Sequence, residues 1–254
     1  MQGNRMKLLN LMPILLVAAA PVFATTITAT GNDGPNWETN ACPGNVPTTP
    51  TCVIGLPTDF AIQSATFTVN NTANSGNGSA SAEIFTNYGN SNLSPFTFNS
   101  VGLAAADMLI SVGGLEYALV LYSHDSLSQG GLYLLTGEET AGTVLNNVSG
   151  QYRNTLDVWG NPTGAVLIGQ GTVTVNPFGN GTSAPELDVQ INGINPVGGH
   201  NFSALVSNGL TFEVASADCG NGVVYGAVPE PGTLALAGSA LVGLVFLSRR
   251  RSTK

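Results

Sequence analysis

The sequence predicts an all-β protein, a β-sandwich in which a jelly roll is one of the arrangements that fit. Three observations lead to this prediction. Gly, Asn and Pro interrupt the chain at short intervals, and the runs between them are rich in Val, Thr, Phe, Leu and Ile, which favour strands. The one helix-like run before the C-terminal region is GLAAADM at 102–108. The chain has 254 residues, of which 43% are hydrophobic, so it is long enough to bury one sizeable core.

The first 24 residues have the three parts of a secretory signal peptide. Two basic residues, Arg5 and Lys7, precede an apolar run at 8–20, and Val22 and Ala24 occupy the positions that a signal peptidase reads. We expect the Sec machinery to export the chain and signal peptidase to cleave it between Ala24 and Thr25. An uncleaved N-terminal anchor is the less favoured alternative, because the apolar run is short.

From residue 25 the sequence reads as strands and turns, and we expect one domain over 25–226. About ten strands fit into this length, as in a sandwich. Apart from the β-prone start TTITATG, strands are expected at SATFTVN (64–70), AEIFTNY (82–88), PFTFNSV (95–101), GLYLLTG (131–137), GAVLIGQGTVTVN (164–176) and NGVVYG (221–226).

Two hairpins and one half-buried strand can be placed more closely. The run at 107–112 is expected to turn at Gly113-Gly114 and return along LEYALVLY (115–122), whose unbroken apolar character indicates a central strand covered on both faces. In SALVSNGLTFEV (203–214), Asn208-Gly209 suits a tight hairpin turn between two strands. In ELDVQIN (186–192) apolar and polar residues alternate strictly, as in a strand with one buried face.

Charge excludes one class of partner. Only 9% of the residues are charged, and all acidic residues except Glu230 lie between residues 25 and 228, where Arg153 is the single basic residue. Nucleic acids are bound through Lys and Arg, so we expect no nucleic-acid partner, and anionic lipid surfaces are disfavoured for the same reason. Divalent cations and neutral sugars remain compatible with this balance.

Three cysteines are present in a chain that is expected to reach an oxidising compartment. Cys42 and Cys52 close a Pro-rich loop and are expected to form a disulfide. Pairing of either one with Cys219 remains an alternative that the sequence leaves open. A catalytic role for Cys219 is disfavoured, because no His or basic residue stands near it to stabilise a thiolate.

No catalytic residues are expected, and the protein is expected not to be an enzyme. His124, Asp125 and Ser126 have the residue types of a catalytic triad, but adjacent residues of a strand point to opposite faces. They are therefore expected to form a polar cluster at the end of a strand. The same argument applies to Glu138-Glu139 as a glycosidase pair. An extracellular hydrolase is the least favoured alternative.

No cofactor is expected, and the metal ligands, if any, are unknown from the sequence. A structural Ca²⁺ is nevertheless a hypothesis for so acidic a body, and GNDGPNWE offers oxygen donors without the spacing of an EF-hand loop. These donors are Asn32, Asp33, Asn36 and Glu38. Three aromatic residues are candidates for a platform on which a sugar could stack, although Trp residues more often anchor a core or a loop. They are Trp37, Tyr152 and Trp159.

The C-terminal region, 227–254, has a distinct pattern. An apolar run at 234–247 is followed by Arg249, Arg250 and Arg251. As a helix it would be about 21 Å long, which is short for a bilayer core of about 30 Å, so it fits as a single tilted or locally thinned transmembrane segment. The arginines form a basic anchor that would keep this end in the cytoplasm and leave the body outside.

A short motif with two prolines precedes this helix. Val228, Pro229, Glu230, Pro231 and Gly232 favour an extended backbone, because proline cannot join a helix interior. In order and position, the motif, the helix and the arginines resemble the PEP-CTERM sorting signal of exported bacterial proteins. The same kind of tail is also labelled an ice-binding protein C-terminal domain, a label that describes the tail and not the body.

The resemblance implies a substrate of exosortase, a membrane enzyme that acts near Pro-Glu-Pro, in bacteria that make exopolysaccharide and biofilm. We expect the chain to be exported to the cell surface or the extracellular space, held by its C-terminal helix in the inner membrane transiently or permanently. A structural or adhesive role associated with exopolysaccharide is the first hypothesis for the body. A carbohydrate-binding module that recognises exopolysaccharide is the alternative.

Overall fold

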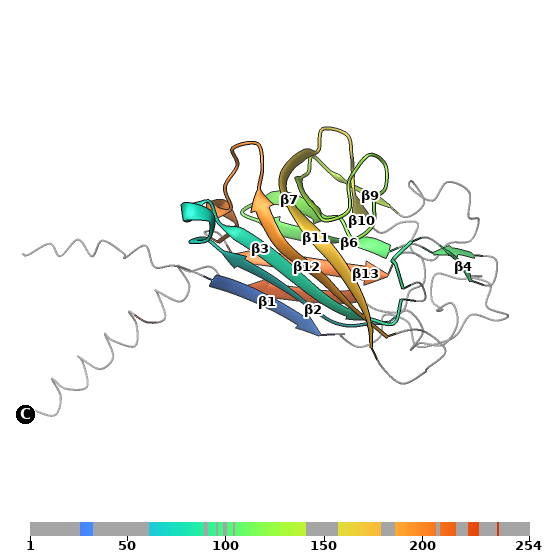
Figure 1. Cartoon of the computed structure of the whole chain (residues 1–254). Coiled ribbons are helices and arrows are strands. Elements are labelled where there is room, and N and C mark those ends of the chain that lie inside the picture. The colour runs from blue at the N-terminus through green and yellow to red at the C-terminus, as the bar shows by residue number, and fades with distance from the viewer. Residues whose placement is uncertain are drawn as a thin grey trace, which may run out of the picture.

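A computed structural model describes residues 26–32, 61–88, 91–94, 96–98, 101–103, 105–140, 157–178, 186–206, 209–216 and 223–228, together with Gly238. Within the body these residues form strands, their connections and two short 3-10 turns, η2 (Asn74–Gly76) and η3 (Ser203–Val206). The prediction of an all-β body is confirmed, and Figure 1 shows the strands gathered into one curved body.

Ten strands form one antiparallel sheet. In spatial order they are β1 (Thr26–Asn32), β2 (Ile62–Asn70), β3 (Ser79–Thr86), β12 (Glu186–Pro196), β11 (Val166–Phe178), β8 (Gly131–Leu134), β7 (Leu115–Leu119), β6 (Ala105–Val112), β13 (Leu210–Ser216) and β14 (Val223–Val228). Three pairs of neighbours in this sheet, β3 with β12, β11 with β8 and β6 with β13, are distant in sequence. Two small hairpins lie beside this sheet, β4 (Phe96–Phe98) with β5 (Val101–Leu103), and β9 (Glu138–Thr140) with β10 (Asp157–Gly160).

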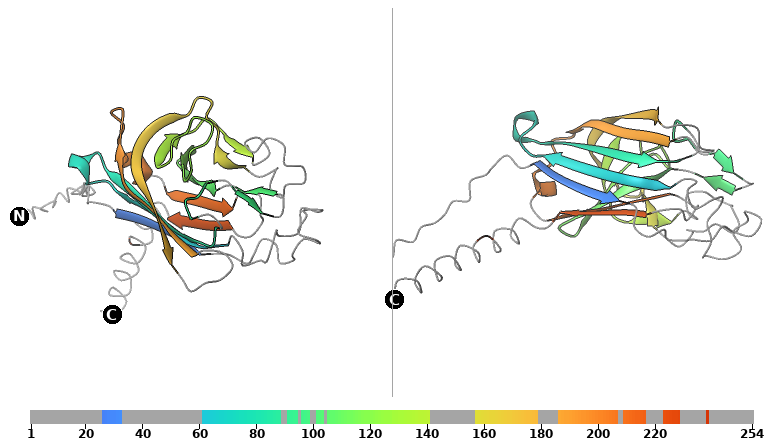
Figure 2. Two further views of the ribbon diagram at one scale, coloured as in Figure 1. Left: turned by 45° about the vertical axis from the view of Figure 1, so that its right-hand side comes forward. Right: turned by 90° about the horizontal axis from the view of Figure 1, so that it is seen from below.

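The sheet arrangement corrects the expected sandwich. One sheet curves round until its two halves face each other, where two separate sheets had been expected (Figure 2). The bend falls on the long strand β11, whose register shifts between Leu167 and Gly169 and again between Gln170 and Thr172. Such bulges bend a strand and increase its twist. At Gly169 a Cβ atom would lie 2.6 Å from Cζ of the buried Phe202, so the absence of a side chain lets the curved strand close over the core.

The two terminal strands meet where the sheet nearly closes. β1 is hydrogen-bonded to β2 and β14 to β13, and β1 also packs directly against β14. At Gly31 a Cβ atom would lie 2.5 Å from the carbonyl oxygen of Tyr225. The first and last described strands of the body therefore form a seam, which we call the β1–β14 seam, and they lie side by side in both views of Figure 2.

The main core lies inside the curved sheet and takes side chains from both halves. Its largest fully buried members are Phe67, Phe202, Ile84, Leu93, Met108, Ile110, Leu119 and Leu132. A second cluster lies on the outer face of β6, β7 and β8. It comprises Leu109, Ala118, Val120, Leu127, Tyr133 and Leu135. β7 is thus covered on both faces, as its unbroken apolar sequence predicts.

Several local predictions are confirmed. β6 and β7 form a hairpin through Gly113 and Gly114, which have φ values of 59° and 80°. In β12 the apolar side chains of Leu187, Val189 and Ile191 are all buried. Because a bulge follows Ile191, β12 continues to Pro196 and Ile194 is also turned inward.

Two local predictions are wrong. The run at 203–206 is the 3-10 turn η3, which buries Leu205 and Val206, so the expected hairpin around Asn208-Gly209 does not form between two strands. β13 pairs instead with β14, the next strand along the chain, and with β6, which is distant in sequence. The helix-like run at 102–108, for which a turn was the alternative, contributes residues 102–103 to β5 and 105–108 to β6. Ala105 and Ala106 are both buried in β6.

Most residues for which the sequence made predictions at the two chain ends, and all three cysteines, lie outside the described residues. These are the signal peptide with Ala24 and Thr25, the cysteines Cys42, Cys52 and Cys219, the motif residues Pro229 to Gly232, and Arg249, Arg250 and Arg251. Of the region 227–254, Ala227, Val228 and Gly238 are described. Among the residues that the structure describes, no helix has the length and apolar character needed to cross a membrane.

Candidate functional site

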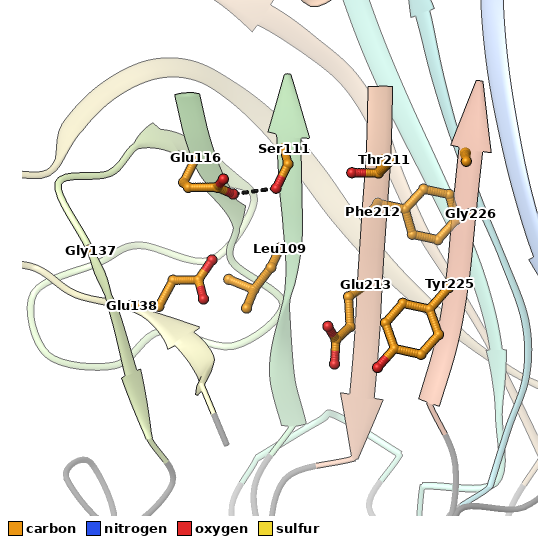
Figure 3. Close-up of a pocket in the computed structure, with 11 residues that line it drawn as sticks. Leu109, Ser111, Glu116, Gly137, Glu138, Thr211, Phe212, Glu213, Tyr225 and Gly226 are labelled. Atoms are coloured by element: carbon orange, nitrogen blue, oxygen red, sulfur yellow. Dashed lines mark hydrogen bonds between the residues drawn. The ribbon is translucent and has the colours of Figure 1, made fainter. Parts of the chain in front are cut away.

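An open groove of about 660 Å³ crosses the outer face of β6, β7, β13 and β14 (Figure 3). It is lined by Leu109, Ser111, Glu116, Gly137, Glu138, Thr211, Phe212, Glu213, Tyr225, Gly226 and Ala227. We call it the outer groove. The chain that follows β8 forms one wall, and Figure 3 shows Glu138 on that side, facing the strands.

Strand alternation places the groove's side chains on the outer face. Ile110 on β6 and Val214 on β13 belong to the core and therefore face inward. Leu109 and Glu213, which directly precede them on the two strands, face outward. The ladder sets Glu213 directly between Leu109 and Tyr225. One row across three strands therefore combines an apolar, a charged and an aromatic side chain.

Three carboxylates make the outer groove acidic. Glu116, Glu138 and Glu213 line it, and Ser111 Oγ donates a hydrogen bond to Glu116 Oε2. All seven Lys and Arg residues of the chain lie outside the described part. Carboxylate oxygens of this kind accept hydrogen bonds from hydroxyl and amine donors.

Tyr225 gives the outer groove an aromatic face. Its side chain is 60% exposed, the largest exposure among the large apolar side chains of the described residues. Tyr rings combine an apolar face with a polar hydroxyl, which suits contact with the faces of sugar rings and with cations. The groove therefore has the chemical elements of a binding surface for a polyhydroxylated or amine-bearing ligand.

A second polar cluster lies beside the outer cluster, and we call it the Asp107 cluster. Asp107, on β6, is 1% exposed. Its Oδ2 accepts a hydrogen bond from the backbone N–H of Gly160 at 2.9 Å and lies 3.0 Å from His124 Nε2. The other ring nitrogen of His124 lies 3.4 Å from Asp125 Oδ2. Through these contacts Asp107 ties the end of β10 and the turn at 124–127 to the sheet.

The Asp107 carboxyl group and the His124 ring shift each other's protonation. Burial raises the pKa of Asp107, and the hydrogen bond and charge of His124 offset this only in part. For His124 burial alone would lower the pKa, but Asp107 and, more weakly, Asp125 outweigh burial and raise it. The pair therefore holds protons in the folded state to higher pH than in the unfolded chain.

This geometry confirms a polar cluster at His124 but corrects the reason given for it. The residues form a tight turn and not a continuous strand, with His124 bridged to Leu127 and φ values of 42° at Asp125 and 73° at Ser126. Adjacent side chains of this turn do reach each other, as the contact between His124 and Asp125 shows. Both ring nitrogens face carboxylates, so the arrangement does not place the imidazole against a nucleophilic hydroxyl.

The other candidate residues are only partly placed. Asn32 ends β1, whereas Asp33, Asn36 and Glu38 lie outside the described residues, as do Trp37 and Tyr152. Glu138 lines the outer groove, and Glu139 and Trp159 belong to β9 and β10. Within the described ranges, no group of three or more His, Cys, Asp or Glu side chains is arranged to hold a metal ion.

The outer groove and the part that Asp107 plays in the cluster at His124 were not predicted from the sequence. One signal for Asp107 was available, because a carboxylate in the otherwise apolar run at 105–110 must find a partner if that strand is buried. Glu116, Glu213 and Tyr225 also stood at alternating positions of expected strands. Their proximity depends on the pairing of β6 with β13, which no local pattern indicated.

Comparison with known proteins identifies the C-terminal region. Residues 227–251 match the family model described as the PEP-CTERM protein-sorting motif. This match confirms the resemblance found in the sequence and begins within β14, at Ala227. No curated protein and no solved structure matches the chain. The motif implies an exported protein that passes through a membrane, with exosortase as its processing partner.

Proposed function

We propose that this chain, which carries the PEP-CTERM sorting motif, is a surface or extracellular-matrix protein that an exosortase-type system processes and whose β-sheet body has a structural or adhesive role. The motif at 227–251 carries the proposal. The signal peptide expected at 1–24 supports it, because both ends then direct the same body to the outside. Association with exopolysaccharide and biofilm is part of this proposal.

The position of the motif supports processing next to a folded body. β14 ends at Val228, which pairs with Leu210 of β13, and Pro229 follows directly. Pro229 and Pro231 bias their preceding residues toward an extended backbone, the form in which proteases and transpeptidases bind a peptide. Removal of the tail after this point leaves all ten strands of the sheet within the product.

We propose that the body is not an enzyme and needs no cofactor. The described candidates for acid–base chemistry support this, because His124 is held between two carboxylates. The outer groove is open, whereas glycoside hydrolysis needs two carboxyl groups fixed on either side of the scissile bond. A Ca²⁺ ion bound by the acidic body would have a structural role and would take no part in catalysis.

Intact mass tests the processing. The protein is recovered from the culture medium and cell envelope of a strain that has exosortase and of a matched strain without it, and its C-terminus is sequenced. We expect a product that ends near Pro229 only where exosortase is present. A chain that keeps Arg251 in both strains would contradict processing and favour a permanent membrane anchor.

The outer groove favours a second function, binding of neutral exopolysaccharide. Tyr225 offers a stacking face, and the carboxylates of Glu116, Glu138 and Glu213 accept hydrogen bonds from sugar hydroxyls. Glycan-array and affinity-electrophoresis measurements test this with Tyr225→Ala, and with Tyr225→Phe as the matched control. Binding that Tyr225→Ala weakens by about tenfold, and Tyr225→Phe much less, is expected from the loss of roughly 1–2 kcal/mol of ring contact. No binding by the unaltered protein would eliminate this second function.

A further inference from the structure

We infer that the end of the body from which the sorting segment leaves lies against the lipid surface while the tail is in the membrane. This inference rests on the proposed function, since it requires a tail that enters the bilayer. It adds an orientation and a contact surface, which we call the membrane-facing end. Three observations carry it: the strand register, the length of the connecting peptide and the position of exposed apolar side chains.

The register defines which residues share this end. Val228 pairs with Leu210, Leu210 with Val112, and Val112 with Leu115. The last residue of β14 therefore lies level with the hairpin turn at Gly113-Gly114. On the other half of the sheet, Thr26 pairs with Asn70 and Asn70 with Ser79. β1 and β14 are antiparallel across the β1–β14 seam, with Gly31 next to Tyr225, so the start of β1 lies at the same end as Val228 (Figure 2).

The connecting peptide is too short to hold the body away from the bilayer. Five residues, 229–233, separate β14 from the apolar run at 234–247. Even fully extended, they span at most about 17 Å. The headgroup region occupies several ångströms of this distance. Once the apolar run is inserted, the membrane-facing end must therefore be at or very near the lipid surface.

Exposed apolar side chains gather toward this end. The large apolar side chains that are exposed in the described residues are Leu115, Val166, Leu167 and Tyr225. Leu115 is in the same row as Val228, and Val166 lies opposite Leu134, which pairs with Tyr117. Tyr225 precedes Val228 by three residues, or about 10 Å along the strand. Leu and Val can enter the outer edge of the acyl region, and Tyr favours the membrane–water interface.

Three turns of this end are free of carboxylates, whereas the connection after β8 leads into Glu138 and the connecting peptide contains Glu230. The segments 71–78, 113–114 and 197–201 contain no Asp or Glu, in a body that is otherwise strongly acidic. The nearest carboxylate in the register is that of Glu116, which accepts the hydrogen bond from Ser111 and lines the outer groove. Carboxylates close to lipid headgroups lose hydration and are repelled by anionic lipids. The composition of these three turns is compatible with a lipid surface as the partner.

The start of β1 fits the same orientation. Cleavage is expected between Ala24 and Thr25, and β1 begins at Thr26. Signal peptide and sorting helix are both membrane segments, and both join the body at the membrane-facing end. The opposite end, where β3 leads past Thr86 toward Ser91 and Asn92, would then face away from the bilayer.

Site-specific photo-crosslinking tests this orientation. The full chain, with its signal peptide removed by export, is purified and reconstituted into vesicles of phosphatidylethanolamine and phosphatidylcholine. A benzoyl-phenylalanine probe replaces Leu115 in one sample and Val166 in a second, and the exposed Ser91 in a control. Lipid adducts are counted by mass spectrometry, and circular dichroism confirms that each variant keeps its β-sheet. We expect severalfold more adduct at Leu115 and Val166 than at Ser91.

The outcomes separate this inference from the proposed function. A chain that fails to float with the vesicles would contradict a membrane-inserting tail, and the inference would fall with it. A chain that floats but forms equal adducts at all three positions, or more at Ser91, would overturn the orientation alone. Adducts at Leu115 that join two protein chains in place of lipid would assign this end to self-association and would also overturn the inference.

Discussion

Asp107 is an ionisable residue that is almost completely buried, so the body must accommodate its ionisation. Its carboxylate is buried and holds β10 through the N–H of Gly160 and the turn at 124–127 through His124. A hydrogen bond to a charged group typically contributes about 1.5–3 kcal/mol, and loss of one partner leaves the other unpaired. The Asp107 carboxylate is thus one of the contacts that hold the hairpin β9–β10 against the sheet.

We predict that Asp107→Asn lowers the free energy of unfolding by about 1–3 kcal/mol near pH 5.5. The pKa values of Asp107 and His124 are both raised in the folded protein, so the folded state binds more protons than the unfolded chain. Their contribution is fully present below the unfolded pKa values and is lost as pH rises through the raised ones. The difference between the two proteins should therefore shrink toward pH 9.

Urea unfolding followed by circular dichroism at several pH values measures this difference. Asp125→Asn is the matched control, because the Asp125 side chain is 41% exposed and contributes less to the pKa of His124. It should change stability by less than about 0.5 kcal/mol. A difference between the unaltered protein and Asp107→Asn that stays constant or grows with pH would contradict the assigned pKa directions.

Among the strands, β11 decides whether the sheet can close. Gly169 lies where its register shifts, and an added Cβ would come within 2.6 Å of Phe202 Cζ and 3.1 Å of Ile194 Cγ2. Both neighbours are fully buried. We predict that Gly169→Ala destabilises the body by about 1–3 kcal/mol, as expected for overpacking. Thermal unfolding followed by circular dichroism measures the loss.

Gly137→Ala provides the control for this substitution. A Cβ atom at Gly137 would meet no atom within 4 Å, so the midpoint of thermal unfolding should change little. The double variant Gly169→Ala, Phe202→Leu should recover part of the loss if the collision with the ring is its cause. Equal effects of Gly169→Ala and Gly137→Ala would show that β11 tolerates a side chain at its bend.

Local sequence patterns identified the strands well but not their order. The alternation in β12 and the Gly113-Gly114 turn depend on neighbouring residues only, and both were predicted correctly. Residues 203–206 were placed in a strand because an apolar run of four does not distinguish a strand from a short buried turn. Pairing of β3 with β12, or of β6 with β13, depends on contacts between distant segments. The outer groove could not be predicted, because its walls come together only through that pairing.

At the scale of the whole molecule, β14 belongs to the body although the sorting motif begins within it. Val224 is fully buried, and β14 packs against β1 and β13. We predict that a chain of residues 25–228 unfolds cooperatively, whereas one of residues 25–222 does not. Loss of β14 uncovers Phe212 and Val214 of the core, and each such exposure costs up to about 1.5–3 kcal/mol, a large part of the usual stability of a domain.

Differential scanning calorimetry of the two truncated chains checks this prediction. Retention of a single sharp transition by residues 25–222 would contradict it and would make β14 part of the sorting segment alone. Residues 25–228 represent the product of cleavage close to Pro229. A cooperative transition for this chain would mean that exosortase can release a complete, stable body.

The β1–β14 seam has a consequence for the timing of export. β1, the first strand of the described residues, packs against β14, the last of them, so contacts of great sequence separation complete the fold. Such long-range contacts form slowly, and strands without partners are prone to aggregation while they wait. The polypeptide must therefore remain unfolded through most of its secretion and close only when its final strand has left the translocon, at the moment when the cleavage site also becomes accessible.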